Sequence, residues 1–191
     1  GDLVLRLAAL LHDVGKPRTK QGPHFYRHEQ IGADMTHAML SRLRFSTEVV
    51  ETTEHLVRQH MYLADPDLSD PALRRFIRRI GPANLDRQFA LRAADIAGSG
   101  MPKRGDSNER FQARVYAEVA RKPPFSVKDL RVDGDDVVKV MVQKGAAPQG
   151  FRGDKRVGEA LQYLFEQVTD QPERNEPDTL TALLDQYFGG S

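Results

Sequence analysis

The residues best suited to chemistry are a histidine and an aspartate at the end of an apolar run. In LAALLHDVGKP, residues 7–17, five apolar side chains lead directly to His12 and Asp13. Imidazole nitrogen and carboxylate oxygen suit divalent cations such as Mn²⁺, Fe²⁺, Zn²⁺, Ni²⁺ or Co²⁺. Because the pair follows an apolar segment, we expect it to lie in the interior, where a carboxylate needs a cation or a metal ion as its partner.

Helical periodicity predicts three more ionisable side chains that face inward. His28 and His60 each continue the apolar face of their helix, and Asp95 lies in LRAADIAG among apolar neighbours. His37 and His55 fall on polar faces and are expected to be exposed. Taken singly, each inward position also fits a hydrogen-bonded core residue. Their convergence favours a metal pocket formed by His12, Asp13, His28, His60 and Asp95.

The elements that position these residues are predicted to be helices almost throughout. The apolar spacing indicates helices over residues 3–11, 28–44, 47–60, 85–97 and 108–121, and an arginine-rich helix that begins after Ser69. Ser46 is a suitable N-cap for the helix that follows it. Residues 3–11 are apolar all round, which predicts a helix buried on most sides. Residues 14–27, rich in glycine, proline and lysine, are expected to form a loop.

The double proline in RKPPFS, residues 121–126, predicts a domain boundary. Beyond it, residues 127–142 fit a helix or a strand equally well, and residues 143–153 fit a loop. Apolar spacing predicts helices over residues 154–169 and again towards the end of the chain, with Asn175 or Asp178 near the start of the last helix. We predict an all-α protein with two domains, residues 1–122 and 123–191.

Composition narrows the class of protein. The chain has 191 residues, a net charge of +1 and no cysteine, which excludes disulfides and thiolate metal sites. The near-neutral charge does not by itself indicate a nucleic-acid partner. No apolar run approaches the roughly 18 residues of a membrane-spanning helix, and the N-terminus does not resemble a signal peptide. We therefore expect a cytoplasmic protein with no membrane partner.

One basic cluster lies in ALRRFIRRI, where apolar residues occupy one helical face and arginines the other. A solvated face of a core helix would account for the pattern. A functional alternative is a patch that contacts phosphate or RNA, because guanidinium groups match phosphate oxygens in shape and charge. The candidate residues for this patch are Arg74, Arg75, Arg78 and Arg79.

Four segments together, LLHDVGKP, HFYRHEQIGA, LVRQHM and LRAADIAGSG, resemble the HD superfamily of metal-dependent phosphohydrolases. More narrowly, the chain resembles the HD-containing C-terminal region of bacterial tRNA nucleotidyltransferases. VDGDDVVKVM and RVGEALQYLFEQVTDQPERN are similar to the tail of that family, which contacts tRNA. The resemblance implies an HD-domain helical bundle followed by a small helical tail. It is looser in VQKGAAPQGFRGDKR, where the family has a shorter turn.

The resemblance implies that His12, Asp13 and Asp95 are metal ligands. It also implies that His28 and His60 bind a second metal ion or contact the phosphate. Members of the superfamily carry a further histidine ligand on a helix before the His-Asp pair. No histidine precedes His12, so we expect that residues are missing in front of this chain.

Lys16 matches a lysine that contacts substrate phosphate in related enzymes, although in isolation it would be interpreted as a solvated loop residue. The expected function is a metal-dependent phosphohydrolase with Asp13, Lys16 and His28 as catalytic residues. Its cofactor would be a divalent ion: Mn, Ni, Co, Mg, Fe or Zn. The resemblance implies nucleotide or RNA-terminal phosphoesters as substrates: 2′,3′-cyclic nucleotides, 2′-nucleotides or phosphomonoesters.

The alternative is a non-catalytic, tRNA-binding body and tail, in which basic residues such as Lys155 and Arg156 help to hold the acceptor arm. The Gly-Ser and Asp-x-Asp motifs of nucleotide addition do not occur here in the required context, so we do not expect this chain to add nucleotides alone. A separate nucleotidyltransferase head domain would then be a partner. A vestigial site, or a signalling HD enzyme acting on guanosine tetraphosphate or cyclic dinucleotides, is less favoured by the motifs.

Overall fold

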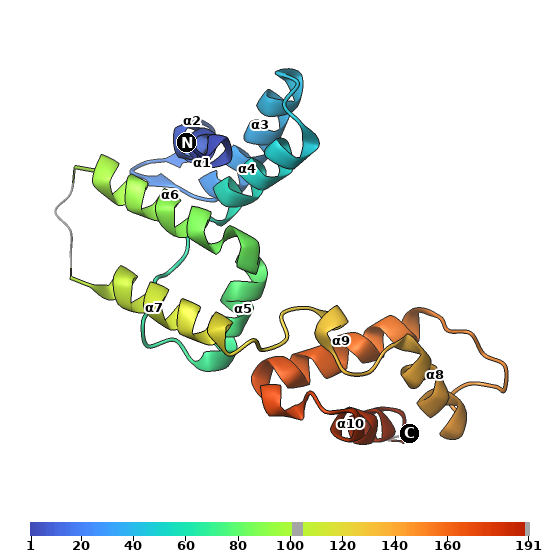
Figure 1. Cartoon of the computed structure of the whole chain (residues 1–191). Helices are drawn as coiled ribbons and strands as arrows, with labels where there is room; N and C mark the ends of the chain where they lie inside the picture. Colours follow the sequence, from blue (N-terminus) through green and yellow to red (C-terminus); the bar gives the residue numbers. More distant parts are fainter. Residues whose placement is uncertain (101–104, 190–191) are drawn as a thin grey trace. The chain divides into compact units, whose positions relative to one another are not determined.

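The computed structural model describes residues 1–100 and 105–189, and their regular secondary structure is helical apart from one short hairpin (Figure 1). This confirms the predicted all-α class. The chain divides into two compact units, Gly1–Asp67 with Arg79–Arg114, and Leu68–Arg78 with Val115–Ser191. Helices α5 (Asp70–Ile80) and α7 (Ser107–Ala120) therefore contribute to both units. Compactness does not show which segments fold independently, so the predicted domains 1–122 and 123–191 stay a prediction.

The first unit is built mainly from α1 (Leu3–Leu11), α3 (His28–Arg42), α4 (Thr47–Gln59) and α6 (Leu85–Gly98). The long helices α3 and α4 pack along each other, and α1 packs against both α4 and α6 (Figure 1). The 3₁₀ turn η1 (Pro82–Asn84) precedes α6. The buried apolar core between the helices consists of Val4, Ala8, Ala33, Leu56, Val57 and Leu91.

Short polar side chains set where two of these helices begin. The carboxylate of Asp2 accepts a hydrogen bond from the Leu5 N–H, and the Ser46 hydroxyl accepts one from the Val49 N–H. Each bond satisfies a backbone donor that has no partner within the first turn of its helix. The predicted N-cap at Ser46 is thereby confirmed. At the other end of α1, His12 is the C-cap, so the His-Asp pair lies directly beyond the helix.

The segment predicted as a loop, residues 14–27, contains regular structure, and the prediction was wrong in that respect. It forms α2 (Lys16–Thr19) and a hairpin of β1 (Lys20–Gln21) and β2 (His24–Phe25). Gly22 lies in the turn with φ of 59°, a left-handed conformation that glycine adopts without steric cost. Elements this short carry too few residues for periodicity to detect them.

The prediction that α1 is buried on most sides was also wrong. Its buried residues are Val4 and Ala8, whereas Leu3 is 50% and Leu10 77% exposed. The helix packs on α4 and α6 along one face. An all-round apolar sequence states how much surface a helix can bury, but the number of neighbouring elements decides how much it does bury.

The second unit contains α8 (Gly134–Gln143), α9 (Lys155–Asp170) and α10 (Pro177–Gly189), which pack on one another. The 3₁₀ turn η2 (Val127–Asp129) precedes α8, and η3 (Pro172–Arg174) lies between α9 and α10. Of the ambiguous residues 127–142, the first three form η2 and residues 134–142 belong to α8, whose first turn is fixed by a capping box between Asp133 and Asp136. The buried core comprises Leu130, Val132, Val137, Val140, Met141, Ala147, Ala160, Leu164, Phe165, Val168, Leu180 and Leu184.

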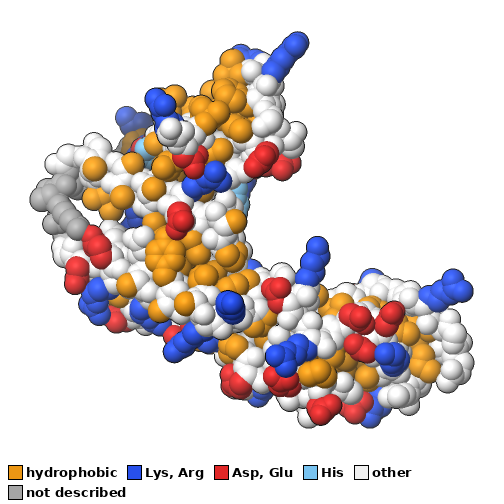
Figure 2. All heavy atoms as spheres, in the orientation of Figure 1, with side chains coloured by type: hydrophobic (Ala, Val, Ile, Leu, Met, Phe, Trp, Pro, Cys, Tyr) orange, Lys and Arg blue, Asp and Glu red, His pale blue; other side chains and the backbone are white. Residues whose placement is uncertain are grey.

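Charged side chains of both signs are interspersed over the visible face of the described residues, which agrees with the small net charge of +1 (Figure 2). None of the described helices is long and apolar enough to span a bilayer.

Candidate metal centre

Three histidines meet because each stands at the end of a helix in the first unit. His12 caps α1, His28 is the first residue of α3, and His60 caps α4. In each ring Nδ1 lies near the backbone carbonyl three residues earlier, at 2.9, 2.8 and 2.7 Å respectively. A carbonyl oxygen only accepts hydrogen bonds, so Nδ1 carries the proton. The Nε2 lone pair of every ring is therefore left for another partner.

The Asp13 carboxylate lies between these lone pairs. Its Oδ2 is 3.4 Å from Nε2 of His12, and its Oδ1 is 3.4 Å from Nε2 of His28 and 3.9 Å from Nε2 of His60. On the outer side, Oδ1 of Asp95 is 3.3 Å from Nε2 of His12. Asp13 thus belongs to two sets of candidate ligand atoms, one with His12 and Asp95 and one with His28 and His60.

These donor atoms fit a divalent cation. Nε2 of His28 and Nε2 of His60 are 3.2 Å apart, and with both protons on Nδ1 their lone pairs face each other. Nε2 of His12 is a buried nitrogen with no hydrogen-bond partner in residues 1–100 and 105–189. Asp13, His28 and His60 offer ligand atoms that all lie within 4.8 Å of one another. Nitrogen and oxygen ligands without thiolates suit Mn²⁺, Fe²⁺, Zn²⁺, Ni²⁺ or Co²⁺.

The centre is closed on one side and open on the other. His28 and His60 are each 6% exposed, whereas the Asp95 side chain is 47% exposed. The expectation that Asp95 is buried was wrong, because its alanine neighbours on α6 face solvent as well. A cavity of about 370 Å³ leads to the ligands, lined by Ala9, His12, Asp13, Lys16, Leu91, Ala94, Asp95, Gly98 and Ser99.

The local electrostatics favour the metal-binding forms of Asp13 and His60. Burial acts to raise the pKa of Asp13, but the hydrogen bond from Lys16 (Nζ to Oδ2, 2.5 Å) and the charge of that ammonium group outweigh it and hold this pKa below its ordinary value. Burial is the main cause that lowers the pKa of His60. A carboxylate and a neutral imidazole are the forms that bind metal ions.

Two glycines that the sequence interpretation did not single out set the spacing of this centre. A Cβ atom on Gly15 would lie 2.2 Å from the carbonyl oxygen of His28 and 2.7 Å from the N atom of Gly32. The segment that carries Asp13 and the first turn of α3 therefore approach at a distance that only glycine permits at position 15. The available signal was the glycine two residues after Asp13 in HDVG, followed by one four residues after His28.

The remaining histidines are placed differently. His37 is exposed, as predicted, and its Nδ1 is 2.7 Å from a carboxylate oxygen of Glu54. His55, predicted to be exposed, is partly buried, with Nε2 2.8 Å from the carbonyl oxygen of Ile80. A polar helical face can be partly buried where it contacts the end of another helix, here the last residue of α5, and periodicity alone does not predict such a contact.

The arginine cluster contributes to the second unit. Arg74 is 7% exposed, and its guanidinium donates to Glu118 and to two backbone carbonyls. A phosphate contact was therefore wrongly expected for Arg74, because its donors are enclosed. Arg75 pairs with Asp170, and Arg78 pairs with Glu166. For Arg75, Arg78 and Arg79 a phosphate contact stays a prediction.

Comparison with known proteins relates the chain to tRNA enzymes. It is 33% identical over 170 residues to the CC-adding tRNA nucleotidyltransferase of Thermus thermophilus, covering 86% of this chain and 36% of that protein. It is 31% identical over 179 residues to the A-adding tRNA nucleotidyltransferase of Deinococcus radiodurans, covering 86% and 37% respectively. The bifunctional uridylyltransferase/uridylyl-removing enzyme of Ruegeria pomeroyi is 31% identical over 137 residues, 69% of this chain and 14% of that protein.

The chain spans little more than a third of the length of the two tRNA nucleotidyltransferases that it matches. No solved structure matches it significantly. The HD domain family matches residues 2–97, the segment that carries all five residues around the candidate centre. With half of its 191 residues matched, the chain belongs to the HD domain family.

Proposed function

We propose that this chain is a metal-dependent phosphohydrolase acting on nucleotide phosphoesters: 2′,3′-cyclic nucleotides, 2′-nucleotides or phosphomonoesters, at RNA ends among them. The observation that carries the proposal is the position of the Asp13 carboxylate, whose two oxygens each face Nε2 lone pairs. A hydrogen-bonded core cluster pairs donors with acceptors. Here acceptors face acceptors, and a bound cation would satisfy all of them.

His12, Asp13 and Asp95 would hold one divalent ion at the open side. His28 and His60, with the other oxygen of Asp13, would hold a second ion or contact the phosphate. When bound, such an ion polarises a phosphoryl oxygen and lowers the pKa of a water molecule towards neutrality. The three hydrogen bonds that the Nδ1–H groups donate to backbone carbonyls would keep the rings oriented without reorganisation during the reaction.

Lys16 would supply positive charge to the substrate. Its Nζ lies next to Asp13, it lines the cavity, and it is 5.7 Å from the ring centroid of Phe25. An ammonium group here can donate to a non-bridging phosphate oxygen as negative charge develops there. His28 lies at the enclosed end, where the exclusion of bulk water strengthens each electrostatic contact.

The comparisons support nucleotide chemistry. The names of the Thermus and Deinococcus relatives describe enzymes that act on tRNA, and the name of the Ruegeria relative includes removal of a uridylyl group, which is a nucleotide ester. Each of these activities concerns a phosphoester of a nucleotide. The proposal for this chain rests on its own ligand geometry and takes only the substrate class from these names.

The test is hydrolysis of 2′,3′-cyclic AMP by the purified chain with Mn²⁺, Ni²⁺ or Mg²⁺, alongside a chelator control. We expect turnover that requires the metal and is lost in Asp13→Ala. The matched control is Asp34→Ala, which removes a carboxylate from the exposed side of α3, where it pairs with Arg58. Absence of both metal retention and turnover in the wild-type chain would overturn the proposal, as would equal activity of Asp13→Ala.

A second candidate function is a tRNA-binding body and tail that works with a separate nucleotidyltransferase head. Similarity to the two tRNA nucleotidyltransferases covers 86% of the chain, beyond the HD segment at residues 2–97. The expected result is tRNA binding that persists with chelator present and weakens as salt rises, since backbone contacts dominate recognition of helical RNA. Absence of a mobility shift at low salt would contradict this function.

A further inference from the structure

The segment from α2 to the start of α3, beside the candidate metal centre, carries positive charge with no acidic residue to balance it. Residues 14–28 include Lys16, Arg18, Lys20 and Arg27 but neither an aspartate nor a glutamate. Arg18 and Lys20 are exposed, and within residues 1–100 and 105–189 neither side chain has an ion-pair or hydrogen-bond partner. Their positive charge is therefore available to a ligand.

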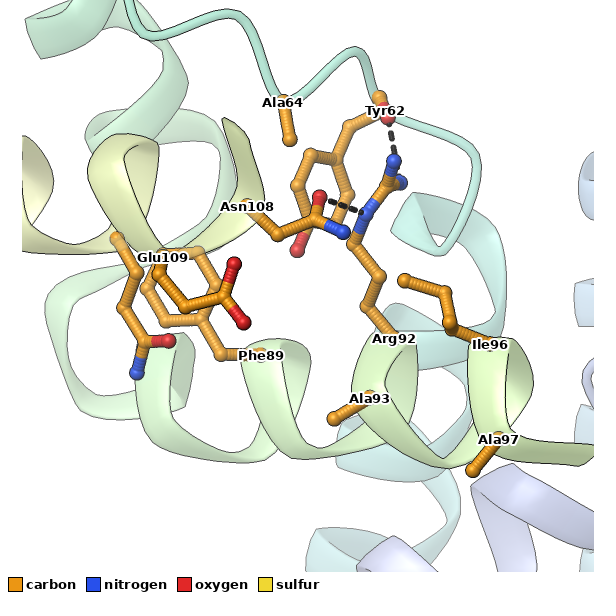
Figure 3. Close-up of a pocket in the computed structure, with 10 residues that line it drawn as sticks. Tyr62, Ala64, Phe89, Arg92, Ala93, Ile96, Ala97, Asn108 and Glu109 are labelled. Carbon is orange, nitrogen blue, oxygen red and sulfur yellow. Dashed lines mark hydrogen bonds between the residues drawn. The ribbon is translucent and has the colours of Figure 1, made fainter. Parts of the chain in front are cut away.

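Arg92 on α6 is a cation of the same unit that the chain itself satisfies. Its Nη1 donates to the Tyr62 carbonyl at 2.8 Å and its Nε donates to Oδ1 of Asn108 at 2.9 Å, as Figure 3 shows. Its guanidinium also lies over the Tyr62 ring, 4.6 Å from the centroid. These contacts hold Arg92 in the wall of a separate cavity of about 340 Å³. No such contact with the described residues holds the ammonium group of Lys20.

The register of the hairpin places Lys20 on the side of Lys16. Lys20 lies directly opposite Phe25, and the side chains of an opposite pair project from the same face of a sheet. The Phe25 ring is close to Lys16, whose Nζ lies 5.7 Å from the ring centroid. His24 and Tyr26 alternate with Phe25 and so belong to the other face, where their ring centroids are 5.4 Å apart. Lys16 and Lys20 therefore flank the same aromatic ring.

This face of the hairpin is connected to the centre by direct contacts. Lys16 lines the metal cavity and donates to Oδ2 of Asp13, and the Phe25 carbonyl accepts from Nδ1 of His28 at 2.8 Å. Lys20 follows Lys16 by four residues, which is about 6 Å along a helix. The row of neighbouring side chains that runs outward from the centre is Asp13, Lys16, Phe25 and Lys20.

We propose that Lys20 binds the phosphate on the 5′ oxygen of the nucleotide whose phosphoester lies at the metal centre. This inference rests on the proposed phosphohydrolase function and narrows its substrate class. A free 2′,3′-cyclic nucleotide has no phosphate on its 5′ oxygen, whereas the last nucleotide of an RNA strand has one. The contact therefore selects the ends of RNA strands over free 2′,3′-cyclic nucleotides.

The charge of the segment matches a strand better than a free nucleotide. A substrate with a single phosphate places that group beside Asp13 and Lys16, and it leaves Lys20 without a partner. A strand of RNA carries a negative charge at every nucleotide, so its next phosphate supplies the partner. The lysine ammonium is a compact charge on a flexible four-carbon stem, which can follow a phosphate whose position varies with the conformation of the strand.

The test compares kcat/KM for two dinucleotides that end in a 2′,3′-cyclic phosphate. Their bases and sugars are identical, and the linkage is a phosphodiester in one and an uncharged methylphosphonate in the other. The ratio of the two values therefore reports the charge of the linking phosphate. We expect the wild type with Mn²⁺ to prefer the charged dinucleotide about fivefold, the effect of one exposed charge pair, and Lys20→Gln to lose most of that preference.

Arg18→Gln is the matched control, since it removes one positive charge from the same segment. Residues 16 and 18 are about 200° apart around a helix, so Arg18 lies on the opposite side of α2 from Lys16. The preference should persist in this variant. An equal loss in Arg18→Gln and Lys20→Gln would show an effect of net charge alone and would overturn the proposed contact. Absence of the preference in an active wild type would overturn it as well.

A binding measurement separates this inference from the proposed function. Fluorescence anisotropy of a 5′-labelled RNA hexanucleotide with a 3′-phosphate is followed in the presence of chelator, where no hydrolysis is needed. We expect Lys20→Gln to weaken binding about fivefold and to reduce the slope of log Kd against log salt by about 0.7, the loss of one phosphate contact, and Arg18→Gln to change neither. This result without any hydrolysis would overturn the phosphohydrolase function and support the RNA contact. Equal binding by the wild type and Lys20→Gln would overturn the contact alone.

Discussion

Each unit holds a cluster of ionisable side chains that are buried or partly buried, and the two clusters are built in opposite ways. In the second unit the Arg74 guanidinium meets a carboxylate oxygen of Glu118 at 2.5 Å and the Thr169 carbonyl at 2.9 Å. The other carboxylate oxygen of Glu118 accepts from Arg121 at 3.2 Å. Donors face acceptors throughout, and the cluster needs nothing from outside the chain.

The cluster around Asp13 in the first unit shows the converse. Three Nε2 lone pairs and two carboxylates converge, and Lys16, at the edge of the cavity, is the cation that the described residues place beside them. The difference suggests a way to distinguish a cluster of charges that stabilises the fold from one that binds a ligand. A cluster whose donors and acceptors balance stabilises the fold, whereas an excess of acceptors indicates a site for a ligand that brings positive charge.

The largest expected effect is that of a substitution that breaks the balanced cluster of Arg74 and Glu118. Glu118→Gln leaves the buried Arg74 guanidinium without its counter-charge, and the free energy of unfolding should fall by about 3–5 kcal/mol. In metal-free protein Asp13→Asn should change it by less than about 1 kcal/mol, since the Asp13 pair with Lys16 is partly exposed. Urea titration in the presence of chelator measures both.

The double variant Arg74→Met with Glu118→Leu is the control for this prediction. Replacement of both charged partners by apolar residues should recover most of the lost stability, because no unpaired charge remains. A loss for the double variant as large as that for Glu118→Gln would mean that packing, rather than charge balance, sets the cost.

The next effect tests the unbalanced cluster. If a divalent ion completes it, Mn²⁺ at about 100 times its dissociation constant should raise the free energy of unfolding by about 2.7 kcal/mol. Differential scanning calorimetry with and without Mn²⁺ measures the change. The increase should vanish in Asp13→Asn and persist in the double variant of Arg74 and Glu118. An equal increase in Asp13→Asn would place the ion elsewhere.

The third prediction concerns backbone spacing in the two units. Gly15→Ala forces a Cβ atom against the backbone of α3, which should cost about 1–3 kcal/mol and move His28 away from Asp13. Gly158→Ala, in the interior of α9 with nothing within 4 Å of the added Cβ, should instead stabilise the protein by about 0.5–1 kcal/mol.

Thermal unfolding and Mn²⁺ titration by calorimetry distinguish these two variants. Gly15→Ala should weaken the binding of Mn²⁺ as well as lowering the melting temperature, and Gly158→Ala should leave binding unchanged. Wild-type affinity for Mn²⁺ in Gly15→Ala would show that the glycine contact serves packing only.

Helical periodicity was sufficient to predict the burial of two residues of the candidate centre, because it assigns residues to faces of a helix. His28 and His60 were predicted to face inward and are buried. Asp95 fell on a segment rich in alanine, and alanine occurs on buried and exposed faces alike, so its burial was mispredicted. Helical phase predicts on which side of a helix a residue lies. Whether that side is buried depends on the elements that pack against it.

Features that depend on pairs of distant residues were beyond the sequence argument. Nothing in ALRRFIRRI shows that Arg74 meets Glu118, 44 positions away, rather than solvent or phosphate. The fit of Gly15 against α3 likewise depends on how closely two elements approach. The short hairpin at residues 20–25 is set by its turn and has only two residues in each strand. In each case the deciding contact is non-local or too short to leave a periodic signal.

The smallest expected effect comes from a cluster of partly exposed charges on α3 and α4. Contact with solvent weakens each ion pair there, so this cluster shows how much stabilisation is lost without burial. Glu54 on α4 accepts from Arg58 and from His37, each at 2.7 Å. Burial acts to raise the pKa of Glu54, but these two hydrogen bonds outweigh it and hold the pKa below its ordinary value of 4.5. Because both partners are solvated, the contribution at pH 7 should be only about 0.5–1 kcal/mol.

The pH dependence of this contribution follows from its sign. The unfolded chain binds a proton at Glu54 at a higher pH than the folded chain does, so the stabilisation is present above pH 4.5 and is lost as the pH falls through the lowered pKa. Urea titrations of the wild type and Glu54→Gln should therefore differ at pH 7, and the difference should shrink as the pH falls below 4.5. Glu51→Gln, which removes the same charge from an exposed position of α4, is the control. A difference that stays constant down to pH 3 would mean that Glu54 acts through packing and not through its charge.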